Sequence, residues 1–242
     1  MIAMVLCAGH GTRLGDLTRE IPKPMLPIQG KPLLEYTLFY LARHGFDQVV
    51  INLHFMPGKI QGYFEDGRRL GIRITYSYEE TLLGTAGGPK KAAHILSQAD
   101  SFLLLYGDLL IDHDLSAMMA FHRERQTMAT LLLHQRHRSN SLVAMDEANR
   151  IVAFIERPTE EQRALNPLPW VNSGVYVLKS DILDRILPDT PCDFPRDIFP
   201  DLVVSEPCYG FPLSGYRCAI DSPSRYEEAQ AAVAGGRYRS PM

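Results

Sequence analysis

Residues 6–25 read LCAGHGTRLGDLTREIPKPM and continue an apolar run that begins at residue 1. A continuous apolar run of this length that ends in glycines is typical of a buried strand. Glycine adopts backbone conformations closed to other residues, so the N–H groups around Gly9 and Gly11 can converge on an anion. The stretch lacks the GxxxxGK[ST] pattern, and Leu14 stands where GxGxxG needs its last glycine. The glycines alone leave two interpretations open, a phosphate-binding loop and an ordinary strand-to-helix turn.

Two basic residues, Arg13 and Lys23, accompany the glycines. Lys23 stands between Pro22 and Pro24, which stiffen the backbone and place its ammonium at a small entropic cost. A basic group held in this way suits a phosphate ligand. The alternative is a solvated lysine in a loop.

The composition is that of an ordinary globular protein: 242 residues, 45% hydrophobic and 22% charged. The net charge of −3 gives no electrostatic argument for nucleic acid or an anionic membrane, so neither is an expected partner. No apolar run approaches the ~18–20 residues that span a bilayer, and no basic region typical of a signal peptide precedes the first apolar run. The four cysteines form no CxxC motif, which favours buried, reduced thiols in a cytoplasmic protein.

The first half of the chain alternates between two patterns. Short apolar runs predict strands at residues 1–7, 48–53, 72–78 and 101–106. Apolar residues at helical spacing predict helices at residues 33–43, 57–64, 84–96 and 115–125. This alternation predicts a Rossmann-like α/β fold, a three-layer sandwich with a mixed, mainly parallel sheet. Such sheets bind ligands at the carboxyl ends of their strands.

The second half reads as strands joined by short connections. We expect strands at residues 128–135, 141–145, 151–156 and 171–178, and two more within residues 209–220. Short helices are expected at residues 181–187 and 195–204, and a terminal helix at residues 222–234. Ser222 suits the N-cap of that helix, Pro223 its first position, and Gly235 its end. These strands are predicted to be antiparallel additions to the sheet.

Seven motifs along the chain carry a resemblance to one family. They are GHGTRL at residues 9–14, PKPMLPI at 22–28, GKPLLEY at 30–36, LGTAG at 83–87, YGD at 106–108, FIERP at 154–158 and VNSGVY at 171–176. In this order and spacing they resemble the sugar-1-phosphate nucleotidyltransferases. The pattern is most similar to mannose-1-phosphate and D-glycero-D-manno-heptose 1-phosphate guanylyltransferases.

The resemblance implies a nucleotide-diphospho-sugar transferase fold of the GT-A-like kind. It implies one catalytic domain over residues 1–242, with a nucleotide-binding half at 1–125 and a sugar-phosphate-binding half at 126–242. The length accommodates only this domain, so no β-helix domain is expected. The implied reaction joins a nucleoside triphosphate to a sugar 1-phosphate and releases pyrophosphate. The attacking phosphate is already anionic, so catalysis needs positioning and charge neutralisation rather than a protein base.

The resemblance also assigns residues to roles. It implies nucleotide binding by Leu6, Ala8, Gly9, Gly11, Thr12, Arg13, Glu79, Gly84, Thr85, Ala86 and Gly107. It implies sugar-phosphate binding by Glu156, Arg157, Asn172 and Gly174. It implies catalysis by Arg13, Lys23 and Asp108, with Lys23 on the α-phosphate and the attacking phosphate. Asp108 is the implied Mg²⁺ ligand, a hard cation that takes oxygen donors and bridges phosphates.

Each of these assignments has a plainer alternative. Gly107-Asp108 also suits the simple end of a strand. The glycines of residues 84–88 also suit a flexible helix cap, although the N-terminus of the helix they open suits an anion or a ribose. Arg157 stands where the family usually has lysine, and the two cations are not equivalent on a phosphate.

The larger departure lies near the end of the chain. Aligned on Pro223, Ala219 takes the position of the family's second metal-binding aspartate, and Asp221 follows two residues later. Two residues keep the same face of a strand but move the carboxylate by about 7 Å. Three outcomes stay open: Asp221 reaches the metal, water or phosphate replaces the lost ligand, or Asp221 helps to cap the terminal helix.

The base is assigned from residues 70–87, which resemble guanylyltransferases more than thymidylyltransferases. Glu79 or Glu80 could accept hydrogen bonds from guanine, or the two could form an exposed acidic turn. The sequence thus predicts GTP and a manno-configured hexose or heptose 1-phosphate. The alternatives are the same reaction with dTTP, UTP or CTP, and a weakly active regulatory subunit that binds nucleotide sugars. The sequence does not decide between a monomer and a homo-oligomer.

Overall fold

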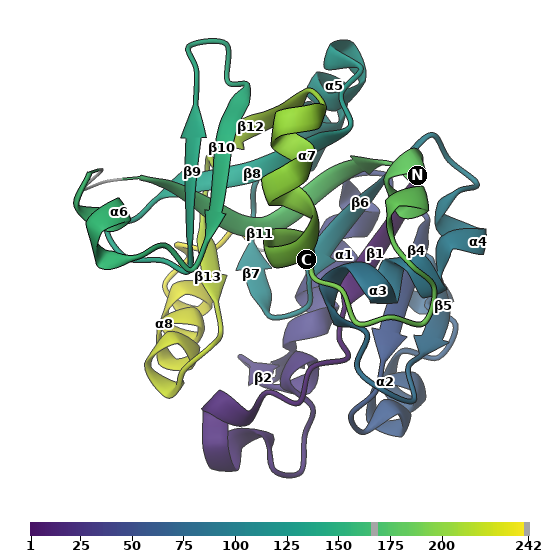
Figure 1. Ribbon diagram of the computed structural model, residues 1–242. Helices are drawn as coiled ribbons and strands as arrows, with labels where there is room; N and C mark the ends of the chain where they lie inside the picture. The colour runs from purple at the N-terminus through teal and green to yellow at the C-terminus, as the bar shows by residue number, and fades with distance from the viewer. Residues whose placement is uncertain (166–168, 240–242) are drawn as a thin grey trace. The chain divides into compact units, whose positions relative to one another are not determined.

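The computed structural model describes residues 1–165 and 169–239, which divide into two compact units. Unit 1 comprises Met1–Leu82, Leu105–Leu115 and the described residues from Ser214 onward. Unit 2 comprises Leu83–Leu104 and Ser116–Leu213. The predicted halves cut the sequence once, whereas each unit collects separate stretches of the chain (Figure 1).

Unit 1 is built on three parallel strands: β1 (Ile2–Leu6), β4 (Gln48–Leu53) and β5 (Arg73–Tyr78). Ile2 lies opposite Gln48, and Gln48 lies opposite Arg73. The first two strands are almost entirely buried, as their largely apolar sequences predict. Because the strands are parallel, their carboxyl ends lie at one edge of the sheet.

The connections of unit 1 contain α1 (Leu33–Arg43), α2 (Pro57–Phe64) and three short 3₁₀ helices, η1 (Thr12–Thr18), η2 (Lys23–Met25) and η3 (Arg68–Leu70). A small hairpin, β2 (Pro27–Ile28) and β3 (Lys31–Pro32), precedes α1. Both α-helices begin and end as the sequence predicts. The helical turn η1 directly after the glycines was not predicted, because Gly15 interrupts it with a φ of 58°.

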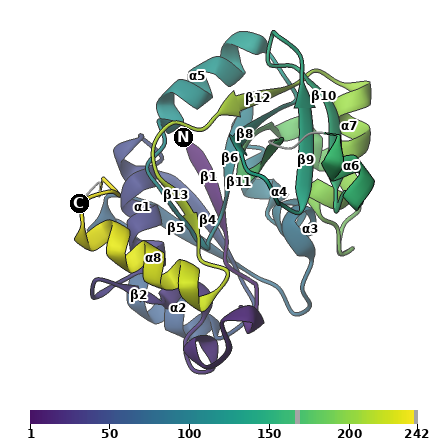
Figure 2. The same cartoon turned by 90° about the vertical axis from the view of Figure 1, so that its left-hand side faces the viewer.

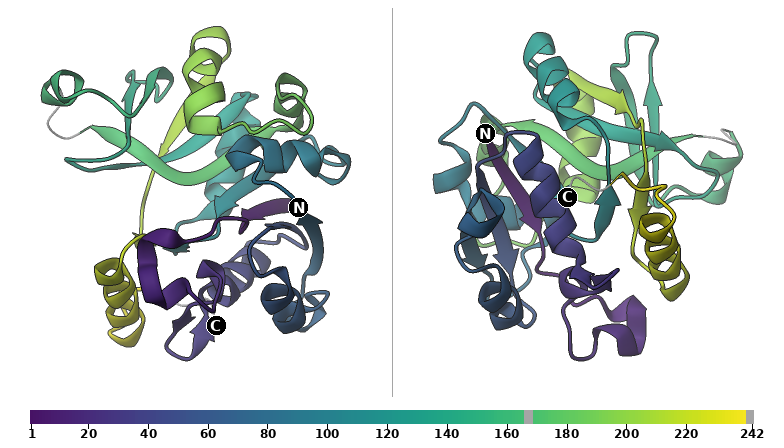
Figure 3. Two further views of the ribbon diagram at one scale, coloured as in Figure 1. Left: turned by 60° about the horizontal axis from the view of Figure 1, so that its bottom comes forward. Right: turned by 180° about the vertical axis from the view of Figure 1, so that it is seen from behind.

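The end of the chain returns to unit 1. Strand β13 (Arg217–Ala219) pairs antiparallel with β7 (Leu109–Ile111) and leads into α8 (Pro223–Ala234) (Figure 3). The Ser222 side chain caps α8 by accepting from the Arg225 N–H, and Gly235 ends the helix, as predicted. Tyr226 and Gln230 of α8 both donate to the Pro27 carbonyl, at 2.6 and 2.9 Å. Helix α8 therefore holds the hairpin that follows the Lys23 turn.

Unit 2 contains a mainly antiparallel sheet of β8 (Ala129–Gln135), β9 (Ser141–Met145), β10 (Ile151–Glu156), β11 (Trp170–Lys179) and β12 (Cys208–Pro212). Strand β11 pairs with β8 and β9, and β10 pairs with β9 (Figure 2). Strand β12 runs parallel to β8. The predicted antiparallel pairing is thus confirmed for β8 to β11, whereas β12, predicted as a further antiparallel strand, pairs in parallel.

The helices of unit 2 are α3 (Gly84–Lys91), α4 (Ala93–Leu96), α6 (Glu160–Ala164), η4 (Ser180–Arg185), the π-helical η5 (Phe194–Ile198) and α7 (Phe199–Ser205). Fully buried Tyr176, Phe194 and Phe199 form an aromatic core with ring centroids 4.9–6.2 Å apart. The helix predicted over residues 84–96 is broken at Ala92, which leaves helical geometry.

Two elements contribute residues to both units, β6 (Ser101–Tyr106) and α5 (Leu115–Arg125). All four cysteines are free, and three of them are buried as expected, whereas Cys192 is partly exposed. In the described part of the chain, no helix combines the length and apolarity needed to cross a membrane.

A buried histidine makes the stability of unit 2 sensitive to acid. His122 of α5 is 2% exposed, its Nδ1 lies 3.0 Å from the Thr130 hydroxyl of β8, and burial lowers its pKa from 6.5 to about 4. Below pH 6.5 the unfolded chain takes up a proton that the folded chain resists. We therefore expect the free energy of unfolding to fall as the pH drops from 6.5 towards 4, by at most about 3 kcal/mol from this residue.

Denaturant unfolding of the parent and His122→Gln across this pH range measures that contribution. Other histidines are common to both proteins, so their effects cancel in the difference. The variant should lose part of the acid sensitivity. An equal loss of stability in both proteins would contradict the assignment.

Candidate functional site

The segment that follows β1 presents unused backbone donors. Residues 9–12, here called the glycine loop, lie between β1 and η1, and their N–H groups donate to no group within the described chain. Gly11 has a φ of 68°, in the left-handed region that favours glycine. Gly9 has ordinary backbone geometry, and a Cβ built on it would meet no atom within 4 Å. A run of free donors beside open space suits an anion.

The side chain of Lys23 packs directly against this loop. A Cβ at Gly11 would lie 3.1 Å from the Lys23 Cβ and 3.3 Å from the Thr18 Cγ2. Gly11 is therefore needed for space as well as for its backbone angle. The flanking prolines sit in and before the single 3₁₀ turn η2, where Met25 N–H donates to the Pro22 carbonyl at 2.7 Å. The backbone around Lys23 is thus held by a hydrogen-bonded turn between two prolines, in line with the predicted stiffening.

The ammonium of Lys23 forms an ion pair with Asp108. Nζ lies 2.5 Å from Oδ2, and the side chains of Lys23 and Asp108 are 12% and 24% exposed. Gly107 brings the carboxylate to this place, because its N–H donates to the Leu6 carbonyl at 2.9 Å. A Cβ at Gly107 would lie 2.6 Å from that carbonyl oxygen and 2.7 Å from the Cys7 sulfur. Burial, together with the negative charge of Asp108, raises the pKa of the Cys7 thiol, which keeps it protonated.

Asp221 is adjacent to the same aspartate through the backbone. Ala219 lies opposite Leu109 in the β13–β7 pair, and the next N–H, that of Ile220, donates to the Asp108 carbonyl at 2.9 Å. Ser222, not Asp221, supplies the side chain that caps α8. The Asp221 carboxylate has no partner within the described residues. The capping alternative is therefore not supported, and Asp221 directly follows the residue whose N–H is bonded to the Asp108 backbone.

The acidic groups can be compared with what a metal requires. The described residues contain no group of three or more His, Cys, Asp or Glu side chains placed to hold a metal ion. Mg²⁺ does not require such a cage, because it is usually held by one or two carboxylates and completes its shell with phosphate oxygens and water. Asp108 and Asp221 fit that donor set.

Glu79, which the sequence predicts to accept hydrogen bonds from the base, lies away from solvent. Its side chain accepts a hydrogen bond from Asn52 Nδ2 at 2.7 Å, and the residue is 1% exposed. A base edge could reach this carboxylate only if it left Asn52. Glu80, the other glutamate that the sequence suggested, is exposed.

The N-terminal amides of α3 are used by the chain itself. The Thr85 N–H and hydroxyl donate to Asp193 Oδ1 at 2.9 and 3.1 Å, and the next two amides donate to the Cys192 carbonyl. A Cβ at Gly84 would lie 2.5 Å from that carbonyl oxygen, so this glycine is required by close packing. The N–H groups of Thr85, Ala86 and Gly87 thus already have acceptors within unit 2, and binding of an anion or a ribose at this helix end stays a prediction. Contacts between the nucleotide and the other atoms of Gly84, Thr85 and Ala86 also stay a prediction.

Glu156 and Arg157 stand at the end of β10 in unit 2. Burial raises the pKa of the half-buried Glu156 carboxyl; the neighbouring Arg157 opposes this shift, and Asp193 adds to it. Asp193, which caps α3, is thus close enough to act on a predicted sugar-binding carboxylate. Arg157 is exposed, has a φ of 53° and donates its N–H to the Asn140 carbonyl at 2.6 Å.

Asn172 and Gly174 shape a bulge in β11. The register against β8 shifts between Asn172 and Tyr176, and Gly174 has a φ of 78°. The Asn172 side chain accepts from the Gly174 N–H at 2.9 Å and donates to the Tyr176 hydroxyl at 2.6 Å. Asn172 thus has a local structural role beside its predicted contact with the sugar.

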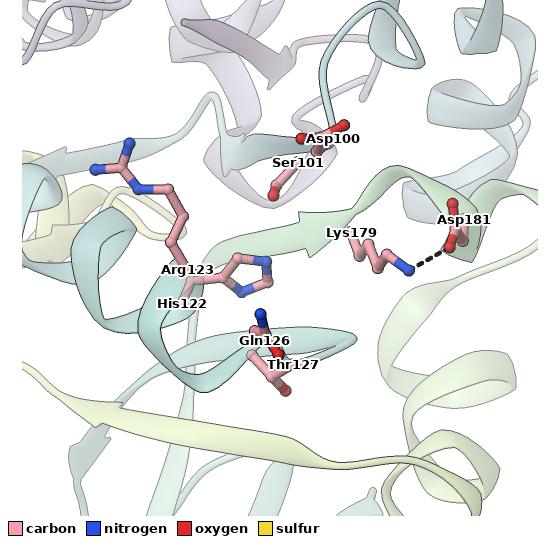
Figure 4. A pocket seen from close by; sticks show the side chains of 8 residues that line it. All are labelled: Asp100, Ser101, His122, Arg123, Gln126, Thr127, Lys179 and Asp181. Atoms are coloured by element: carbon pink, nitrogen blue, oxygen red, sulfur yellow. Dashed lines mark ion pairs between the residues drawn. The ribbon is translucent and has the colours of Figure 1, made fainter.

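A cavity of about 690 Å³ lies elsewhere in unit 2, lined by Asp100, Ser101, His122, Arg123, Gln126, Thr127, Lys179 and Asp181 (Figure 4). No predicted site residue lines it. Several of its polar groups pair within the chain, since Lys179 binds Asp181 at 2.5 Å and Thr127 donates to the Ala129 carbonyl at 3.1 Å. We assign no substrate to it.

The predicted residues therefore fall into two sets. Unit 1 brings together the glycine loop, Lys23, Gly107 and Asp108, and a backbone hydrogen bond joins the residue before Asp221 to Asp108. Unit 2 holds the α3 segment, Glu156, Arg157, Asn172 and Gly174. Neither Asn52 nor Asp193 was identified from the sequence. Asn52 forms hydrogen bonds with Cys7 and Glu79 in unit 1, and Asp193 accepts from Thr85 in unit 2. A polar residue inside the buried run QVVINL was the available signal for Asn52.

Unit 1 thus combines a parallel sheet, a loop of unused amides after β1 and the Lys23–Asp108 ion pair. A sequence profile described as Nucleotidyl transferase matches residues 2–232, so the chain belongs to the nucleotidyl transferase family.

Named relatives span nearly the whole chain. It is 37% identical over 219 residues to a UTP–glucose-1-phosphate uridylyltransferase of Synechocystis, covering 85% of this chain and 56% of the relative. It is 35% identical over 243 residues to a mannose-1-phosphate guanylyltransferase of Mycobacterium tuberculosis, covering 99% of this chain and 66% of the relative. The chain thus spans between half and two thirds of the length of these curated relatives.

Solved structures confirm the predicted fold class. HddC from Yersinia pseudotuberculosis superposes with a TM-score of 0.79 at 22% identity, covering 96% of this chain and 99% of the other. A UDP-glucose pyrophosphorylase in complex with UDP-glucose superposes with a TM-score of 0.82 at 20% identity, covering 97% and 98%. HddC has also been solved in complex with GMP-PN.

The open space above Gly9 gives a direct test of the glycine loop. We expect Gly9→Ala to leave the melting temperature within about 1 °C of the parent, because neither its backbone nor its surroundings oppose a methyl group. The same methyl would stand where a phosphate approaches the backbone. We therefore expect titration calorimetry to show at least about tenfold weaker nucleoside triphosphate binding.

The matched control is Gly58→Ala in α2, where a Cβ also meets open space. This variant should keep both the stability and the nucleotide affinity of the parent. Unchanged affinity in Gly9→Ala would remove the glycine loop from the ligand site.

Proposed function

We propose that this chain transfers a nucleotidyl group from a nucleoside triphosphate to a sugar 1-phosphate and releases pyrophosphate. The observation that carries the proposal is the run of unused amides in the glycine loop, against the stem of Lys23, whose ammonium pairs with Asp108. The family and the activities in the names of the relatives support the same reaction.

The chemistry requires no covalent intermediate with the protein. A phosphate oxygen of the sugar 1-phosphate attacks the α-phosphorus and forms a new P–O bond. The bond from the α-phosphorus to the bridging oxygen breaks, and pyrophosphate leaves with its electron pair. The nucleophile is already an anion, so no proton must be removed from it. The protein therefore has to align two anions and offset their repulsion.

The residues of unit 1 match these tasks. The glycine-loop amides and the exposed guanidinium of Arg13 hold the triphosphate. Lys23 acts on the α-phosphate and on the attacking phosphate, which would otherwise repel each other. In the free chain Asp108 balances the charge of Lys23. Leu6, Ala8, Thr12 and Gly107 shape the surrounding backbone.

Asp108 and Asp221 are the residues that would hold Mg²⁺. The ion supplies further neutralisation of phosphate charge when it is bound. Within the chain, the hydrogen bond from Ile220 to the Asp108 carbonyl keeps the two acidic residues in neighbouring segments. This adjacency favours Asp221 as the displaced counterpart of the family aspartate that Ala219 replaces.

The residues of unit 2 are proposed to bind the sugar phosphate. Glu156 accepts hydrogen bonds from sugar hydroxyls, and Arg157 offers a planar, two-pronged donor to the phosphate. Asn172 and Gly174 form the bulge of β11 and are proposed to contact the sugar phosphate.

We propose GTP as the nucleotide and a manno-configured hexose or heptose 1-phosphate as the acceptor. Several relatives are named mannose-1-phosphate guanylyltransferases, and exposed Glu80 offers an acceptor for the adjacent N–H donors of guanine. The second candidate is UTP with glucose 1-phosphate, which the Synechocystis relative favours.

Pyrophosphate release tests the reaction and the base together. The parent protein is incubated with Mg²⁺, each of GTP, UTP, dTTP and CTP, and mannose, heptose or glucose 1-phosphate. We expect turnover with GTP and a manno-configured acceptor to exceed every other pair by at least about tenfold.

Turnover only with another nucleotide would contradict the choice of GTP and keep the reaction. Tight binding of a nucleotide sugar without any turnover would contradict the enzyme and favour a regulatory subunit.

The two acidic residues are tested by the dependence of rate on Mg²⁺. We expect Asp108→Asn to lower turnover at least about tenfold, because it removes a hard oxygen donor and the partner of Lys23. We expect Asp221→Ala to raise the Mg²⁺ concentration that gives half the maximal rate.

The matched control is Asp16→Asn, an exposed carboxylate of the same unit that pairs only with Arg19. It should behave as the parent. An unchanged Mg²⁺ dependence in Asp221→Ala would show that Asp221 is no ligand, and an Asp108→Asn variant as fast as the parent would refute the metal assignment.

A further inference from the structure

A buried hydrogen-bond network links the ends of the three parallel strands of unit 1. The Cys7 N–H, just beyond β1, donates to Asn52 Oδ1 in β4 at 2.8 Å. Asn52 Nδ2 donates to Glu79 Oε1, just beyond β5, at 2.7 Å. These three residues are 2%, 2% and 1% exposed, so water cannot replace either bond.

The chemistry of the groups fixes the direction of the network. A backbone N–H can only donate, so it must face the oxygen of the Asn52 amide. The nitrogen of that amide then faces Glu79, whose carboxylate oxygen accepts. One side chain thus satisfies a buried donor and a buried acceptor at once. Loss of the asparagine would leave the Cys7 N–H without its acceptor and would take one donor from the Glu79 carboxylate, and an unsatisfied buried group costs about 1–3 kcal/mol.

A second route joins Glu79 to the glycine loop. Its backbone carbonyl lies 2.8 Å from His54 Nδ1, and its N–H donates to the Leu53 carbonyl at 2.8 Å. The His54 ring packs edge-on against His10, with centroids 5.1 Å apart. His10 belongs to the glycine loop, so Glu79 supports the loop at its start and in its interior.

We propose that Asn52 and Glu79 are positioning residues for the nucleotide, which hold the backbone at Cys7 and thereby place the glycine-loop amides. The inference rests on the proposed function. Only Ala8 separates Cys7 from Gly9, a span of about 7 Å at most, so a shift at Cys7 is carried to the first open amide. Misplacement of such donors by about 1 Å can cost on the order of a hundredfold in rate.

This role differs from base recognition, which the sequence suggested for Glu79. The carboxylate is turned into the protein and engaged by Asn52, whereas Glu80 is exposed. A base-reading Glu79 would depend on its negative charge and its two acceptors. A positioning Glu79 depends only on an acceptor towards Asn52.

Three variants separate these roles. Glu79→Gln keeps an oxygen that can accept from Asn52. Asn52→Asp keeps the acceptor for Cys7 but sets a carboxylate against Glu79. The double variant Asn52→Asp/Glu79→Gln restores the contact in reverse, because the glutamine amide donates to the aspartate. The pair thus still consists of one amide and one carboxylate, but the donor and the acceptor have changed places.

Steady-state kinetics with each variant provide the readout. We expect Asn52→Asp to raise the KM for the nucleoside triphosphate at least about tenfold, with the KM for the sugar 1-phosphate within about threefold of the parent. We expect Glu79→Gln to raise the KM for the nucleoside triphosphate less than Asn52→Asp does, because it keeps an acceptor for Asn52, and to keep the base preference of the parent. The double variant should recover most of the loss caused by Asn52→Asp.

Three results would overturn the inference. A changed base preference in Glu79→Gln would make Glu79 a base-reading residue. A lower melting temperature in Asn52→Asp with unchanged kinetics would make the pair purely structural. A double variant no better than Asn52→Asp would show that the reversed contact does not hold the loop.

Amide hydrogen exchange distinguishes failure of this inference from failure of the proposed function. The Cys7 amide and the glycine-loop amides are followed in the parent, in Asn52→Ala and in the double variant. We expect faster exchange at Cys7 in Asn52→Ala and protection restored in the double variant. A parent that turns over no substrate would refute the function alone, whereas unchanged exchange at Cys7 in Asn52→Ala would refute the network.

Discussion

The ion pair between Lys23 and Asp108 is the interaction on which the candidate site depends. Lys23 lies in a proline-flanked turn, and Asp108 follows Gly107 just beyond the end of β6. Both side chains are largely withdrawn from water. A charge in such a place needs its partner, because an unpaired buried charge is strongly destabilising. A bound polyphosphate would bring further negative charge beside the pair. Lys23 would then be shared between carboxylate and phosphate, and a divalent cation would offset the excess.

Two groups of backbone amides differ in whether they already have acceptors within the chain. Amides at the N-terminus of α3 are satisfied from within, by the Asp193 carboxylate and the Cys192 carbonyl. Amides of the glycine loop have no acceptor in the described chain. An anion gains most where the protein has left donors unpaired and has already fixed their positions. We therefore propose the glycine loop, rather than the N-terminus of α3, as the phosphate site.

The sequence predicted the strands and helices well, because their signals are local. Apolar runs marked β4 and β6 to the residue, and Ser222 with Pro223 marked the start of α8. The phosphate interpretation of Gly11 and Lys23 also followed from local chemistry, namely small residues and a stiffened cation. The break at Ala92 and the turn η1 were missed, since both depend on how short segments pack.

The roles of individual side chains were harder to predict, because they depend on partners far away in sequence. Glu79 gave no local sign that Asn52, 27 residues earlier, would engage its carboxylate. Thr85 gave no sign that Asp193, 108 residues later, would use its N–H. In both cases a polar residue near a predicted ligand was interpreted as a ligand contact. In this structure these residues form hydrogen bonds within the chain.

This distinction bears on how the chain would select a base. Guanine presents two adjacent donors, N1–H and N2–H₂, whereas uracil presents one N–H between two carbonyl oxygens. A free carboxylate accepts both donors of guanine and repels the carbonyls of uracil. Because the carboxylate of Glu79 is held by Asn52, it is not free to make that choice. We therefore propose that the exposed Glu80 selects guanine in unit 1, whereas substitution of Glu79 would affect every nucleotide alike through the loop proposed to hold the phosphates.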